Sequence, residues 1–185
     1  MGEPVNQVLQ AIVDAARDAT GAAGAWALSL RGDRLRAMAA AGERAGERVG
    51  ADMPASSGTA GFVGSSGQPI ALSPRRADPR LADGLASHLG RPPASVLCVP
   101  CVYDEAVVGA LELVDKAGGS SFSFDDVELV TLLASVAGAA LVTGAPTPAV
   151  RTPGELAAEL ADLSVSDPAG YARLATVLDA LLGRG

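Results

Sequence analysis

Two cysteines and a single histidine are the side chains of this chain most able to do redox or metal chemistry. Cys98 and Cys101 form a C-x-x-C motif, which is typical of redox sites when it begins a helix. The surrounding residues instead predict a strand, on which side chains three positions apart point to opposite faces. A direct disulfide would distort that strand, so we expect two small buried hydrophobic side chains. A redox role for one thiol lining a pocket is the alternative.

Other patterns that would indicate catalysis are weak or absent. His88 and the two cysteines are too few ligands for a closed zinc site, and we expect His88 to be an ordinary helix histidine. The sequence has no G-x-S-x-G elbow. Gly58, Gly61 and Gly64 lack the Gly-Lys-Ser/Thr of a phosphate-binding loop and predict close packing against a sheet. We therefore expect no enzymatic activity.

Composition and charge narrow the class of partner. The chain has 185 residues, 49% of them hydrophobic and only 3% aromatic, with a net charge of −7. An acidic surface repels polyanions, so neither nucleic acid nor an anionic membrane is expected as a partner. Residues 129–142 are the longest apolar stretch, too short to span a bilayer, and residues 1–10 do not resemble a signal peptide. These features predict a soluble, cytoplasmic protein.

The first half of the chain reads as a helix, a hairpin and a small helix. Apolar residues recur at helical spacing from Val5 to Ala16. Strands are expected at residues 25–30 and 35–41, joined by a turn at Gly32. A short helix at residues 59–65 and a strand fragment at residues 70–72 follow.

The second half predicts a second hairpin and a long helix. Leu81, Leu85 and Leu89 have the spacing of one helix face. Strands are expected at residues 95–103 and 106–114, joined by the turn Asp104-Glu105. Ser123 then precedes a helix at residues 126–142, with acidic residues in its first turn.

Hairpins give antiparallel strand pairs, so these elements predict an α+β fold with a central antiparallel sheet and helices on both faces. The expected domain covers residues 1–143. A Pro-containing linker follows at residues 144–152, and a short C-terminal helical tail occupies residues 153–185.

Three stretches of the sequence follow one another in a recognisable order. They are GTAGFV (58–63) with GQPI (67–70), SVLCVP (95–100) with VVGAL (107–111), and Asp115-Lys116 with Phe122, Asp125-Asp126 and the following helix. In this order they resemble the GAF domain family over about residues 5–142. The resemblance implies an α+β sensory domain that binds a small ligand between the sheet and the small helices, and often dimerises through its first and last helices.

The third stretch resembles the family's Asn-Lys…Phe-x-x-x-Asp-Glu pattern, which accompanies cyclic-nucleotide binding. Asp115 stands in place of the Asn and Val127 in place of the Glu, so that ligand is not implied. The resemblance implies that Lys116 and Asp126 pair as a structural clip between the loop and the helix.

Other activities known in the family use residues that this chain matches only in part. Haem-binding members use a histidine just before a Pro-Pro pair, where Arg91 stands here, so His88, three residues earlier, could serve only after a local shift. Members that reduce free methionine sulfoxide use three cysteines, whereas this chain has two. By position alone, a ligand pocket would be lined by Met38, Phe62, Asp78, Leu81, Leu85 and Leu97.

The long last helix is apolar around most of its circumference, so more than one of its sides must be covered. A homodimer built on the first and last helices of the domain is the expectation. Three hypotheses therefore remain: a sensor of an unknown small ligand, a ligand-free interaction domain that contacts a signalling protein, and a redox or haem sensor.

Overall fold

The computed structural model of this chain describes residues 4–43, 45–73, 93–143 and 153–181. The chain divides into two units, Met1–Ala145 and Pro146–Gly185. The predicted helix at Leu81, Leu85 and Leu89 lies outside the described residues, and so do His88 and Asp78.

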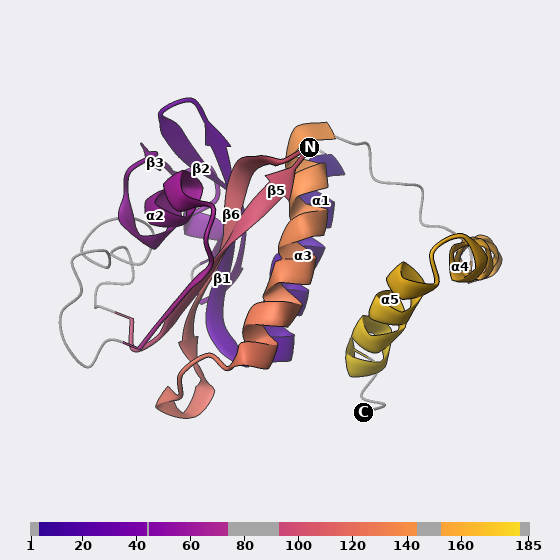
Figure 1. The fold of residues 1–185 in the computed structure, drawn as a ribbon. Helices are drawn as coiled ribbons and strands as arrows, with labels where there is room; N and C mark the ends of the chain where they lie inside the picture. Colours follow the sequence, from indigo (N-terminus) through magenta and orange to yellow (C-terminus); the bar gives the residue numbers. More distant parts are fainter. Residues whose placement is uncertain (1–3, 44, 74–92, 144–152, 182–185) are drawn as a thin grey trace. The chain divides into compact units, whose positions relative to one another are not determined.

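The first unit is built on a six-stranded antiparallel sheet with the strand order β3-β2-β1-β6-β5-β4 (Figure 1). The four inner strands have 8–11 residues, whereas the edge strands β3 and β4 have three residues each. The strands are β1 (Ala22–Arg31), β2 (Arg34–Gly42), β3 (Asp52–Pro54), β4 (Ile70–Leu72), β5 (Val96–Tyr103) and β6 (Ala106–Lys116).

Helices cover both faces of this sheet. Helix α1 (Pro4–Thr20) and helix α3 (Phe124–Thr143) lie side by side on one face, and α2 (Gly58–Ser66) packs against β5 and β6 on the other (Figure 1). Short 3-10 turns, η1 (Ala45–Glu47) and η4 (Ala117–Gly119), complete the unit. The predicted α+β class with an antiparallel sheet is confirmed.

The two faces of the sheet bury separate hydrophobic clusters. We call the one beneath α1 and α3 the helix-pair cluster, and the one beneath α2 the α2-face cluster. The first includes Leu9, Leu97, Leu111 and Leu113. The second includes Trp26, Leu28, Ala60, Val63, Cys98 and Ala110.

The β5–β6 hairpin turns at Asp104 and Glu105, as predicted from the sequence. Both residues have positive φ, 49° and 61°, which matches the twist that a two-residue hairpin turn requires. A register shift between Cys101 and Val102 leaves Val108 as an extra residue on β6, and beyond this bulge Cys98 lies opposite Glu112.

A β-bulge on β2 alters the predicted alternation of that strand. The pairs Ala27↔Ala39 and Leu28↔Ala37 leave Met38 as the extra residue. Because one added residue reverses which face the side chains take, Ala37 lies in the α2-face cluster and Ala39 in the helix-pair cluster.

Glycines allow close backbone approaches at several positions of this unit, two of them on helices. A Cβ at Gly138 of α3 would lie 2.5 Å from the Val102 carbonyl oxygen of β5. A Cβ at Gly61 would lie 2.4 Å from the Ser56 carbonyl carbon, so Gly61 fits α2 onto its own preceding turn rather than onto the sheet.

The second unit contains α4 (Pro153–Ser166) and α5 (Pro168–Leu181), which contact each other. Asp167 caps α5, because its Oδ1 accepts a hydrogen bond of 2.9 Å from the Gly170 amide. In the parts of the chain that the structure describes, every helix is too short or too polar to cross a bilayer.

Candidate functional site

A row of three large or polar side chains crosses the middle of the sheet on the α2 face. Trp26 of β1 pairs directly with Glu112 of β6, and Glu112 pairs with Cys98 of β5. Glu112 lies between Leu111 and Leu113 of the helix-pair cluster, so strand alternation directs its side chain to the opposite face. Directly opposed residues have Cβ atoms about 4.5–5.5 Å apart, so this row brings an indole, a carboxyl and a thiol together.

Glu112 is bound to α2 through one of its two carboxyl oxygens. The Thr59 hydroxyl, at the start of α2, donates a hydrogen bond to Glu112 Oε1. Thr59 and Glu112 are both buried, each 2% exposed. This contact links the central strand of the sheet to the small helix that covers it.

Two polar atoms of this row are buried and have no hydrogen-bond partner among the described residues: Glu112 Oε2 and Trp26 Nε1. One is an acceptor and the other a donor. An unsatisfied buried polar group costs about 1–3 kcal/mol, and native structures keep few of them. A donor and an acceptor left together on neighbouring strands therefore mark this spot as a binding-site candidate.

Burial also sets the electrostatics of the row. Desolvation raises the pKa of Glu112 above its ordinary value, and the Thr59 hydrogen bond only partly opposes that rise. Desolvation, with a smaller contribution from Glu112, raises the pKa of Cys98 well above its ordinary value. At the other end of the row, the Arg48 guanidinium lies 5.3 Å from the centroid of the Trp26 ring.

The two cysteines are free and fully buried on opposite faces of the sheet. Cys98 belongs to the α2-face cluster and Cys101 to the helix-pair cluster, as strand alternation predicts. Burial raises the pKa of Cys101 to about 12. Because the thiolate is the reactive form, neither thiol is prepared for redox chemistry in this conformation.

Three of the six pocket residues predicted from position lie in the described part of the chain, and they take different places in the fold. Leu97 lies in the helix-pair cluster, because it alternates with Cys98, and the bulge packs Met38 against the same cluster. Phe62 is 39% exposed on α2, whose buried residues are instead Thr59, Ala60, Gly61 and Val63. Asp78, Leu81 and Leu85 lie outside the described residues.

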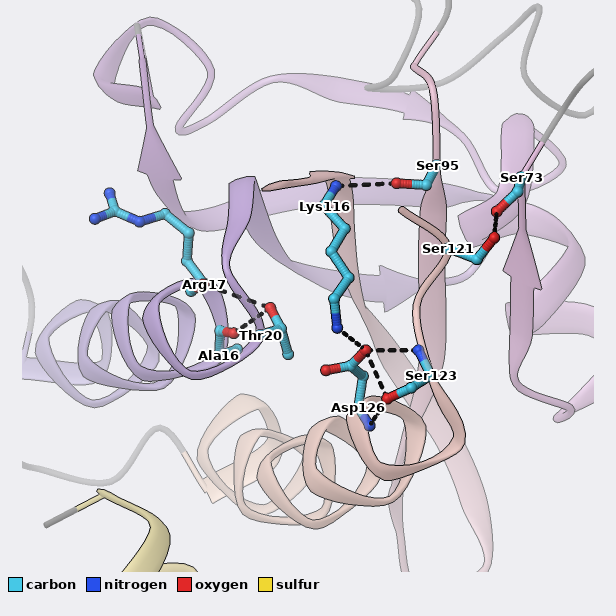
Figure 2. Close-up of polar contacts among 9 residues, drawn as sticks. All are labelled: Ala16, Arg17, Thr20, Ser73, Ser95, Lys116, Ser121, Ser123 and Asp126. Atoms are coloured by element: carbon cyan, nitrogen blue, oxygen red, sulfur yellow. Dashed lines mark hydrogen bonds and ion pairs between the residues drawn. The ribbon is translucent and has the colours of Figure 1, made fainter. Parts of the chain in front are cut away.

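Lys116 and Asp126 form an ion pair at the beginning of α3 (Figure 2). Asp126 Oδ2 also accepts hydrogen bonds from the Ser123 amide at 2.6 Å and the Ser123 hydroxyl at 3.0 Å. The Ser123 hydroxyl in turn accepts one from the Asp126 amide at 3.2 Å, which completes a capping box. The Lys116 amide donates to Ser95 Oγ at 2.9 Å, so Lys116 links the end of β6 to α3 and to the residue just before β5.

Burial of Asp126 alone would raise its pKa, but the hydrogen bonds from Lys116 and Ser123 outweigh that effect and lower it. Asp115, beside Lys116, has a positive φ of 55°, and its Oδ1 accepts a 2.6 Å hydrogen bond from the Ala94 amide. Asp and Asn tolerate this conformation better than other non-glycine residues. The charges of Lys116 and Asp126 are paired with each other, as the resemblance implied.

Sequence reasoning missed Glu112 and Trp26. A signal for Glu112 was present, because it is the one charged residue in the apolar run of residues 106–114. Glu is almost never fully buried unless it is paired, so a Glu within a two-sided buried strand indicates either a partner or a ligand. No pattern in the sequence identified the row itself, since the row depends on the register of three strands.

Comparison with known proteins now decides the family. The family model described as "GAF domain" matches residues 4–141. The chain belongs to the GAF domain family.

Solved structures of GAF domains share the fold of the first unit. The GAF domain of an Acinetobacter phosphoenolpyruvate-protein phosphotransferase has a TM-score of 0.63 and 22% identity, covering 74% of this chain and 81% of that one. The GAF-B domain of DevS from Mycobacterium smegmatis has a TM-score of 0.57 and 21% identity, covering 74% and 92%. At these identities the likeness establishes the fold.

An enzyme also shares the fold. The type II free methionine-R-sulfoxide reductase from Thermoplasma acidophilum has a TM-score of 0.60 and 16% identity, covering 74% of this chain and 92% of that one. GAF domains are generally regulatory, and small-molecule binding is typical of the family, but the fold also accommodates enzymes. Function must therefore be argued from the site of this chain.

Proposed function

We propose that this GAF domain is a non-enzymatic, cytoplasmic sensor that binds a small molecule on the α2 face of its sheet. The observation that carries the proposal is the buried Glu112, whose Oε2 has no hydrogen-bond partner among the described residues. A ligand that supplied that partner would remove a cost of about 1–3 kcal/mol that the free protein bears.

The Thr59 hydrogen bond gives such a ligand a connection to the rest of the domain. A ligand that competes for the Glu112 carboxyl changes the contact between β6 and the start of α2. A bound state with a different α2 position would then be selected by the ligand, in proportion to its differential affinity for the two states.

The other face of the sheet supplies a surface through which a signal could leave. Leu132 and Val136, one turn apart on α3, are 39% and 53% exposed, and Val142 is 47% exposed. A second copy of the chain, packed through α1 and α3, would cover these side chains. We propose a homodimer of this kind, with a signalling protein as the alternative partner for the same surface.

Trp26 makes the binding experiment simple, because it is the only tryptophan in the chain and lies in the proposed site. The protein is titrated with a small-molecule library of cationic, neutral and anionic compounds while Trp26 emission is recorded. The proposal predicts saturable shifts in emission for one chemical group of compounds. If binding compounds leave Trp26 unaffected, or nothing binds, the interaction-domain hypothesis replaces the sensor.

An absorbance spectrum of the same preparation tests the haem alternative. The proposal predicts a colourless protein, and a Soret band would contradict it. Alkylation of the native protein tests the redox alternative, and the two buried thiols are expected to react only after unfolding.

A further inference from the structure

The unpartnered atoms of the row also constrain the chemistry of the ligand. Glu112 Oε2 offers a hydrogen-bond acceptor, and Trp26 Nε1 offers a donor, from directly paired residues of β6 and β1. A single small molecule with a donor and an acceptor close together would satisfy both atoms.

Charge decides what kind of donor fits best. Among the described residues that face Glu112, β5 contributes the neutral thiol of Cys98, α2 the hydroxyl of Thr59 and β1 the indole of Trp26. Burial raises the pKa of Glu112, and the Thr59 hydrogen bond lowers it by less. A buried carboxylate without a cation is costly, whereas charge-assisted hydrogen bonds are the stronger ones.

Arg48 lies on the Trp26 side of the row, where its guanidinium is stacked over the ring. The guanidinium lies over the ring face. The indole N–H bond lies in the ring plane, so it points away from the guanidinium. The donor site at Trp26 is therefore suited to an oxygen of the ligand.

We infer that the ligand is a small organic amine that carries an acceptor oxygen next to its ammonium group, with the ammonium on Glu112 and the oxygen on the Trp26 N–H. The inference rests on the proposed binding function and specifies its ligand class. Compounds of α-amino carbonyl type have this combination, because their nitrogen and oxygen are separated by only two carbon atoms.

Matched pairs of compounds isolate the contribution of the ammonium. We use glycinamide, leucinamide and phenylalaninamide, each against the 2-hydroxy amide of the same shape. Binding is measured by isothermal titration calorimetry and by Trp26 emission. At least one amino amide is expected to bind about 30-fold or more tightly than its hydroxy partner, the range found when one member of a buried charge pair is removed.

Two variants test whether Glu112 is the group that is recognised. Glu112→Gln keeps the shape and the Thr59 contact but removes the charge, and is expected to abolish the preference for the amine. Glu128→Gln removes the same charge from an exposed position of α3, on the other face of the sheet, and is expected to bind like the original protein.

The pH dependence of amine affinity distinguishes direct binding by Glu112 from a purely structural role, because a structural role predicts no such dependence. Below the raised pKa of Glu112, an ammonium ion must displace a proton to bind, so the affinity falls by up to about tenfold for each pH unit. Cys98, the other titratable group in the row, stays neutral in this range because its pKa is raised. Glu112→Gln is expected to remove this pH dependence.

The outcomes distinguish a failure of the inferred ligand class from a failure of the binding function itself. If hydroxy amides or anionic library compounds shift Trp26 emission as strongly as the amines, the site binds a ligand but the inferred class is overturned. If amine binding survives Glu112→Gln, the assignment of Glu112 is overturned. If no compound of the library or the amide panel binds at millimolar concentration, the binding function itself fails with it.

Discussion

At the scale of single residues, Glu112 is the side chain that gives this GAF domain a candidate site. Its neighbours along β6 serve the core, whereas Glu112 places a carboxyl in the centre of the sheet with one oxygen on Thr59 and the other without a described partner. A buried Gln or Met would pack there at lower cost. A function for the carboxyl explains why the position holds a Glu.

The protonation of Glu112 makes the stability of the free domain depend on pH. Its pKa is raised in the folded state by burial. Both states are protonated below the unfolded-state pKa of about 4.3, so the charge of Glu112 adds no cost there, and stability falls as the pH rises from that value through the folded-state pKa. Relative to the original protein, Glu112→Gln is therefore expected to gain about 1–3 kcal/mol at neutral pH.

Urea denaturation of both proteins at pH 4.5 and pH 7.5 measures this difference. The two unfolding free energies should lie closer together at the lower pH. A difference that stays constant with pH would mean that Glu112 does not change its charge in this range.

Asp126 has the opposite dependence, because its hydrogen bonds lower its pKa in the folded state. The stabilisation by Asp126 is present above the unfolded-state pKa of about 3.9 and is lost as the pH falls through the folded-state pKa. Asp126→Asn is expected to cost about 1–3 kcal/mol at neutral pH, since it weakens charge-assisted hydrogen bonds from Lys116 and Ser123.

The control for this change is Asp125→Asn, on the exposed neighbour in the same first turn of α3. Thermal unfolding at pH 7 should distinguish the two, with only a small effect at Asp125. Equal losses would show that general charge at the helix start, and not the clip, stabilises this end of α3.

At the scale of elements, the sequence predicted most of the secondary structure but not its finer register. The β5–β6 hairpin was predictable because two alternating apolar runs flank a two-residue polar turn. The reversal at Met38 was not, since a bulge depends on pairing with β1. The places of the proposed pocket residues also depend on such details, since strand alternation puts Leu97 in the helix-pair cluster and helix periodicity exposes Phe62 on α2.

Gly138 of α3 allows this helix to approach the backbone of β5 closely, because it has no Cβ. Gly138→Ala would set a Cβ 2.5 Å from the Val102 carbonyl oxygen, so one of the two backbones must move. Overpacking of this kind costs about 1–3 kcal/mol, which outweighs the gain of up to about 1 kcal/mol in helix propensity.

Gly64→Ala in α2 is the matched control, because its Cβ would meet only a Leu30 side-chain carbon at 3.4 Å. Differential scanning calorimetry should show a lower midpoint for Gly138→Ala and little change or a gain for Gly64→Ala. A stabilised Gly138→Ala would contradict the close contact with Val102.

At the scale of the whole molecule, we assign different functions to the two faces of the sheet. The α2 face holds the candidate site, and the helix pair offers the surface for assembly. All residues of both hydrophobic clusters precede residue 142, so the GAF unit contains its own core.

Assembly through α3 gives a prediction for the intact chain. Val136→Asp places a charge in the middle of the exposed apolar face of α3 and is expected to convert a dimer into a monomer. Sedimentation velocity at tens of micromolar measures the change, with Thr131→Asp on an exposed polar position of the same helix as control. A monomeric original protein would refute the dimer and leave a different partner for this face.

Native mass spectrometry after incubation with a small-molecule extract of cells tests whether Glu112 holds a ligand. The original chain, Glu112→Gln and Glu128→Gln are treated identically, and their bound masses are compared. We expect the same small-molecule adduct on the original chain and on Glu128→Gln, and its loss from Glu112→Gln. An original chain without any adduct, or an adduct kept at equal occupancy by Glu112→Gln, would contradict it.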